Sequence, residues 1–154
     1  MAFTFNGGTH PKENKNTREK KIVRLTPPAL VSIPLSQHIG APCRALVKPG
    51  DKVLKGQMIG DVENALGVPV HASVSGTVKQ IISKRMPDDR VIENIIIEND
   101  FEDTLAPDIV PCEKTIKELT TDEIVEAVRR AGISGMGGAT FPTSVKISPP
   151  PGKK

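Results

Sequence analysis

The feature that most constrains the fold is a series of short β-branched segments separated by turn residues. From about Ala29 onward, apolar runs alternate with Gly, Pro, Asn and Ser. Spacing of this kind is typical of a compact all-β unit and disfavours long helices. The sequence therefore predicts a mainly β chain, with strands at 30–33, 44–47, 57–62, 68–71, 77–82 and 91–97.

Local signals add detail to this pattern. In Lys48–Asp51 (Lys-Pro-Gly-Asp), Pro presets φ at the second turn position and Gly tolerates a positive φ at the third, which predicts a type II turn. The polar segment 84–90 predicts a hairpin tip. The apolar run Ile95–Ile97 predicts a strand that is covered on both faces.

One helix is expected near the C-terminal end. Thr120 and Glu123 match the capping box, in which each residue bonds the other's backbone amide. Gly132 stands where a left-handed residue ends a helix. The sequence predicts a helix at 121–131, with apolar positions recurring at Ile124, Val125, Val128 and Ala131.

Composition excludes several classes of function. With no Trp, no Tyr and four Phe, the chain has few side chains on which nucleic-acid bases could stack. No apolar window approaches the ~18 residues of a membrane span, and the first residues lack the apolar core of a secretory signal. We therefore expect a location inside the cell. The basic residues within 12–24 predict a solvated arm, or a contact for phosphate or an acidic partner.

The cysteines and histidines suggest structural roles. Cys43 and Cys112 belong to no CxxC motif, and His38 and His71 lie far from both His10 and each other in sequence. No metal site and no catalytic residue are therefore predicted. Cys43 and Cys112 are expected to be free, buried thiols, with one disulfide as the alternative, and His38 and His71 are expected to form structural hydrogen bonds.

Two segments together suggest a particular β fold. Val47–Gly60 and Pro69–Val78 resemble the two halves of a biotinyl/lipoyl-type domain, the barrel-sandwich hybrid. A carrier domain of that type needs a lysine at an exposed hairpin tip, so that its amine can be acylated. The corresponding tip, Glu63–Gly67, contains no lysine. The resemblance therefore indicates a scaffold domain and not a carrier.

The segment Gly132–Lys146 is rich in glycine, with four glycines in its first seven residues. Such a loop can present converging backbone amides to an anion and lets a flat ligand approach closely. It matches neither the P-loop nor the dinucleotide-binding fingerprint. From the residues alone, both ligand binding and a flexible connector remain open.

Four segments in order resemble the C subunit of the Rnf ion-translocating electron transport complex. They are residues 5–11, 34–42, 69–76 and 135–143. The last also resembles the flavin loop of the NADH-oxidising subunit of respiratory complex I, with Met136 in place of Arg and Thr140 in place of Gly.

The resemblance implies a function and a site. A full-length subunit of this family is expected to bind FMN, to react with NAD(H) and to carry two 4Fe–4S clusters. It is expected at the cytoplasmic face of a membrane complex, beside other subunits, where electron transfer between ferredoxin and NAD drives ion translocation. The cofactor-binding residues that the resemblance implies are Gly135, Gly137 and Gly138, through their backbone, and Lys146, at the phosphate.

Because the family's subunit is longer, we expect an N-terminal fragment that alone is inactive, binds FMN weakly or not at all, and lacks the segments that hold the clusters. The alternative is a non-catalytic interaction module with a lipoyl-like fold and no cofactor. The expected divisions are an irregular segment at 1–28, the barrel-sandwich hybrid at 29–100, a linker at 101–119 and the start of an FMN- and NADH-binding domain at 120–154.

Overall fold

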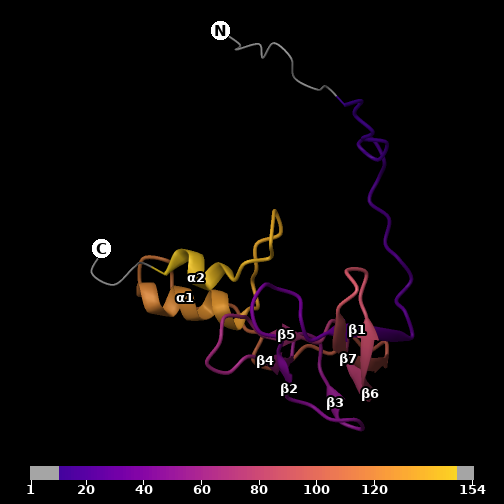
Figure 1. The fold of residues 1–154 in the computed structure, drawn as a ribbon. Coiled ribbons are helices and arrows are strands. Elements are labelled where there is room, and N and C mark those ends of the chain that lie inside the picture. Colours follow the sequence, from indigo (N-terminus) through magenta and orange to yellow (C-terminus); the bar gives the residue numbers. More distant parts are fainter. Residues whose placement is uncertain (1–10, 149–154) are drawn as a thin grey trace.

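The computed structural model describes residues 11–148, so the first family motif, which begins at residue 5, lies largely outside the described residues. Figure 1 shows the strands gathered in one unit, with two helices lying together beside it. The strands are β1 (Leu30–Pro34), β2 (Arg44–Ala45), β3 (Lys52–Val53), β4 (Met58–Asp61), β5 (Val70–His71), β6 (Gly76–Arg85) and β7 (Val91–Asn99). The helices are α1 (Thr121–Arg130) and α2 (Thr143–Ile147).

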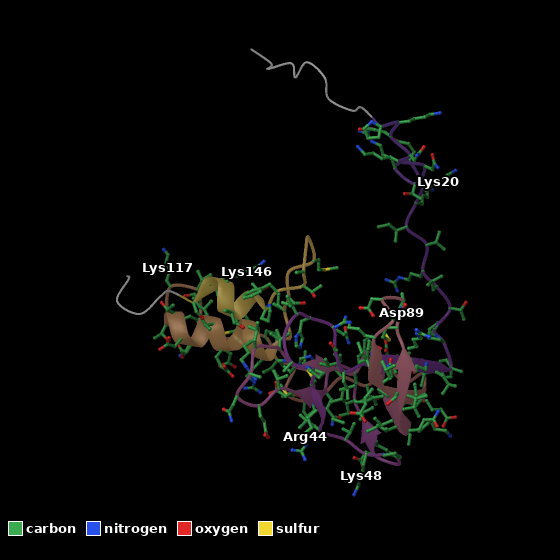
Figure 2. The ribbon with its side chains drawn as sticks, viewed as in Figure 1. Lys20, Arg44, Lys48, Asp89, Lys117 and Lys146 are labelled. Carbon is green, nitrogen blue, oxygen red and sulfur yellow. The ribbon has the colours of Figure 1, made fainter. Side chains whose placement is uncertain are left out.

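Within the described residues 11–148, the strands form two antiparallel sheets. One sheet has the order β1-β7-β6-β3 and the other has the order β2-β4-β5. The long hairpin of β6 and β7 dominates the first sheet, and Asp89 lies at its tip (Figure 2). The prediction of a mainly β chain is therefore confirmed, as is the polar tip at 84–90.

A single apolar core lies between the sheets. Ile95, Ile96 and Ile97 are all buried, which confirms that β7 is covered on both faces. Period-two alternation cannot produce this pattern, because a half-exposed strand buries only every second side chain. The core cluster consists of Ile33, Leu35, Cys43, Val53, Ile59, Val62, Val70, Ala72, Val78, Ile95 and Ile97.

Two positions show why glycine is needed. Asp51 donates its backbone N–H to the carbonyl of Lys48 at 3.1 Å, and Gly50 has φ +93°, so the predicted type II turn is confirmed. Gly76 opens β6 with φ +153°, and a Cβ there would lie 1.9 Å from the backbone oxygen of Glu98. Any side chain at position 76 would therefore push β6 away from β7.

The helix prediction is confirmed to within one residue. The Thr120 hydroxyl accepts from the backbone N–H of Glu123, and the Glu123 carboxylate accepts from the N–H of Thr120. The α1 helix ends at Arg130, and Gly132 follows with φ +68°. The capping box and the glycine thus fix the two ends of α1.

The two segments that flank the sheets behave differently. Residues 11–28 contain no strand or helix and run away from the sheets, with Lys20 far out along this arm (Figure 2). The start of the expected linker, by contrast, lies against the β unit. The backbone N–H of Lys55 donates to the Thr104 carbonyl, and the Lys55 carbonyl accepts from the Ala106 amide, both at 2.9 Å. Ala106 is buried there.

Candidate functional site

The glycine-rich segment forms a hairpin between α1 and α2. Gly135 donates its N–H to the Phe141 carbonyl at 2.9 Å, and Thr143 donates to the Ile133 carbonyl at 3.0 Å. Ser134 and Pro142 form an antiparallel bridge between the two arms. In Figure 1 this hairpin is the orange-to-yellow loop that rises next to the helices.

The hairpin brings two of the predicted site residues together. An ideal Cβ on Gly135 would lie 2.9 Å from Nζ of Lys146, so the absence of a side chain at 135 leaves room for the lysine amine. The Lys146 amine also lies 5.9 Å from the centroid of the Phe141 ring, within cation–π range. The amide of Gly135 is already bonded to Phe141, so it is not free to donate to a ligand.

The other two predicted residues lie at the open turn of the hairpin. Among residues 11–148, the amides of Gly137 and Gly138 donate no hydrogen bond to protein. A Cβ on either glycine would meet no atom within 4 Å, and the neighbouring Met136 is 95% exposed. These two amides are therefore accessible to a ligand at the hairpin tip.

The hairpin is attached to the β unit at both of its ends. The Thr140 carbonyl accepts from the Ile39 amide at 3.3 Å, and Thr140 itself has φ +53°. At the other end, a Cβ on Gly132 would lie 2.6 Å from the Pro69 carbonyl oxygen. Thr140, where the complex I loop has glycine, thus takes the left-handed conformation that glycine favours.

A cavity of about 500 Å³ lies between the hairpin and the β unit. Its size falls within the range of small-molecule sites. Sequence reasoning assigned no site role to the segments 37–38 and 69–71, although they belong to two of the family motifs. Membership in these motifs was the signal from which a role for these segments at the site could have been inferred. The lining residues are Gln37, His38, Val68, Pro69, Val70, His71, Gly132, Ile133, Ser134, Met136 and Thr140.

The two histidines on this cavity differ in their bonding. The ring nitrogens of buried His38 lie 3.2 and 3.0 Å from the carbonyl oxygens of Ile39 and Val68, which confirms its predicted structural role. For His71 that prediction is wrong, because its ring makes no hydrogen bond within residues 11–148. The His71 side chain is only partly buried and lines the cavity instead.

The thiol beside His38 is protected by burial. Cys43 Sγ lies 3.2 Å from the Val68 carbonyl oxygen. Burial, together with the negative charge of Asp61, raises the pKa of the Cys43 thiol from 9.0 to about 11. Cys43 and Cys112 are both free, as predicted, but the prediction that both are buried is wrong for Cys112, which is exposed.

Two negative findings concern the described residues alone. Within 11–148, no group of three or more His, Cys, Asp or Glu side chains is placed to hold a metal ion. No helix in the same range combines the length and apolarity needed to cross a bilayer.

The fold and the hairpin together define a β scaffold of the barrel-sandwich type that adjoins a glycine-rich hairpin. Residues 3–102 match the family model described as the RnfC barrel sandwich hybrid domain, and the chain belongs to this family.

Curated relatives extend the similarity over nearly the whole chain. The C subunit of the sodium-translocating ferredoxin:NAD(+) oxidoreductase complex of Acetobacterium woodii is 44% identical over 98% of this chain, which covers 34% of the relative. The proton-translocating counterpart of Clostridium ljungdahlii is 41% identical over 100% of the chain and 34% of the relative. The C subunit of the ion-translocating oxidoreductase complex of Rhodobacter capsulatus is 38% identical over 96% of this chain, which covers 29% of the relative. The chain thus spans about a third of these relatives' length.

Proposed function

We propose that this chain is the N-terminal part of an electron-transfer subunit in a membrane-associated ferredoxin:NAD oxidoreductase complex that couples electron flow to ion translocation. The hairpin at 133–143 forms one wall of its FMN site. The observation that carries the proposal is the pair of unpartnered amides at Gly137 and Gly138, on the same hairpin as the Gly135–Lys146 contact.

The residues present fit the phosphate end of FMN. The Gly137 and Gly138 amides can donate to phosphate oxygens, and their lack of side chains lets an anion approach the backbone. The Lys146 ammonium adds a positive charge beside Gly135. When bound, FMN supplies the exchange between two-electron and one-electron transfer. The chain's own part is to bind the phosphate and orient the cofactor.

The rest of the proposed activity belongs to the whole subunit. We expect the NAD(H) site, the remaining walls of the flavin pocket and the two 4Fe–4S clusters in other segments of the subunit, with the subunit peripheral on the cytoplasmic side of the membrane. The β unit is proposed to dock neighbouring domains or subunits. The proposed start of the flavin domain remains at residue 120.

FMN titration tests the proposal directly. The chain has no Trp or Tyr, so protein emission does not obscure flavin fluorescence. FMN is titrated into the 154-residue chain and into a chimera that joins it to the part of the A. woodii relative outside the matched region. We expect weak or no binding by the chain and tight binding by the chimera, since a pocket needs several converging walls.

Lys146→Ala identifies the contribution of the lysine. The variant chimera is expected to bind FMN about tenfold more weakly, because it loses a charge-assisted phosphate contact. Lys117→Ala is the matched control. It also removes a lysine charge, but Lys117 lies on the segment before α1, whereas Lys146 lies on α2 (Figure 2), so FMN affinity should not change. A folded chimera that leaves FMN free would contradict the proposal.

The alternative, an interaction module without a cofactor, also has support in the structure. Ile22, Val23 and Leu25 on the N-terminal arm are 100%, 81% and 90% exposed. Three apolar side chains this exposed within four residues are typical of a segment that a partner covers. This alternative predicts that the chimera binds other subunits of the complex but no FMN, whereas the proposed function predicts both.

A further inference from the structure

We infer that the β unit supplies a second wall of the flavin site, and that the cavity between the hairpin and β5 receives the isoalloxazine ring, with His71 as a ring-binding residue. This inference rests on the proposed function, and it changes the role of the β unit. The β unit would hold the cofactor itself in addition to docking neighbours.

The hairpin makes two kinds of contact: some of its residues line the cavity, and Gly135 faces Lys146. Ile133, Ser134 and Met136 line the cavity, whereas the Cβ direction of Gly135 points to Lys146, which does not line it. A ligand that touches both faces has to pass the tip, where Gly137 and Gly138 have open space around them. An elongated ligand with an anionic end and a flat end fits this arrangement.

The chemistry of the cavity decides which end enters it. Its lining contains no Lys, Arg, Asp or Glu. A phosphate would find no counter-charge there, so the cavity suits the uncharged ring, and the phosphate belongs on the face with Lys146. Pro69, Val70 and Ile133 offer apolar contact to a ring. Such a mainly apolar lining with a few polar groups is typical of sites for aromatic cofactors.

His71 is the polar group best placed for the ring. Its imidazole packs against the backbone of Gly132, with Nδ1 and Cε1 each 3.2 Å from where a Cβ would stand. No residue within 11–148 hydrogen-bonds the imidazole, so it can donate to or accept from the polar edge of an isoalloxazine. Among the other polar lining residues, Gln37 already donates its Nε2 to the Pro34 carbonyl at 3.1 Å, and both ring nitrogens of His38 lie against backbone carbonyls.

A comparison of FMN with riboflavin separates the two faces. Riboflavin has the same ring and lacks the phosphate. In the chimera, His71→Leu is expected to weaken FMN and riboflavin by the same factor of about ten, the loss of one net hydrogen bond. Lys146→Ala is expected to weaken FMN only. Ser134→Leu, which fills the cavity, is expected to weaken both ligands. Binding is followed by flavin fluorescence and by the shape of the visible absorption band.

Met58→Leu is the matched control, because Met58 pairs with His71 across β4 and β5 but does not line this cavity. If the unaltered chimera binds FMN while His71→Leu and Ser134→Leu leave both affinities unchanged, the inference is overturned and the proposed function stands. If the unaltered, folded chimera binds neither flavin, both are overturned.

Discussion

Arg129 on α1 forms an ion pair with Asp61 on β4, with Nη2 lying 2.9 Å from Oδ1 and 3.1 Å from Oδ2. The two side chains are only 32% and 24% exposed. This ion pair and the contact of Gly132 with Pro69 hold the helix and the hairpin against the β unit. The walls of the cavity therefore come from segments that are distant in the chain.

Breaking this ion pair is expected to loosen the helix from the β unit. Arg129→Gln leaves Asp61 partly buried without its partner, so we expect the free energy of unfolding to fall by about 1–2 kcal/mol. Urea denaturation measures this change. As a control, Glu98→Gln removes the more exposed Lys79–Glu98 pair and is expected to cost less than about 0.5 kcal/mol. Equal losses in the two variants would show that Arg129 has no special role.

Acid is expected to weaken the start of α1. The Lys114 side chain, followed by the backbone of Thr120, lowers the pKa of Glu123 from 4.5 to about 2. Because the folded-state pKa is depressed, the stabilisation is present above pH 4.5 and is lost as the pH falls toward 2. As the pH falls through this range, the urea denaturation midpoint of Glu123→Gln should decrease less steeply than that of the unaltered protein. Glu126→Gln, at an exposed position of the same helix, should follow the unaltered protein.

The two thiols are expected to react at very different rates. Cys112 is exposed, whereas burial and Asp61 raise the pKa of the Cys43 thiol to about 11. A thiol reagent should therefore modify one cysteine quickly in the folded chain and both in denaturant. Cys112→Ser should abolish the fast phase; a fast phase that persists would place Cys43 in contact with solvent.

The same raised pKa predicts a loss of stability in alkali. The unfolded chain loses the Cys43 proton near pH 9.0, whereas the folded chain keeps it to about pH 11. Stability from this group is therefore complete below pH 9.0 and declines as the pH rises through that window. Cys43→Ala should flatten the decline in denaturation midpoints, and Cys112→Ser should not.

Two glycines of the same segment are expected to respond oppositely to alanine. Gly132→Ala places a Cβ 2.6 Å from the Pro69 oxygen at φ +68°, so we expect a loss of about 1–3 kcal/mol in unfolding free energy. Gly137→Ala meets no atom within 4 Å and should change stability by less than about 0.5 kcal/mol. Thermal denaturation of the two variants provides the comparison, and a stable Gly132→Ala protein would contradict the packing described above.

Much of the fold was predictable because its signals are local. The turn at Lys48–Asp51 depends on the φ preferences of Pro and Gly, and the start of α1 depends on the reach of Thr120 and Glu123 to each other's amides. The strands follow the spacing of β-branched residues. The turn and the helix cap need no distant partner, whereas the pairing of β1 with β7 does. The site was predicted only in part, because resemblance named Gly135 without showing that its amide is bonded to Phe141.

By itself, the sequence determined the mainly β class, the helix and its cap, and the presence of a glycine-rich segment beside a lysine. Only the tertiary structure decided that this segment is a hairpin with two different faces, and that His71 borders a cavity shared with the β unit. The physical reason is separation along the chain. Backbone preferences act over a few residues, whereas Asp61 and Arg129 are 68 positions apart and meet only through the packing of the whole core.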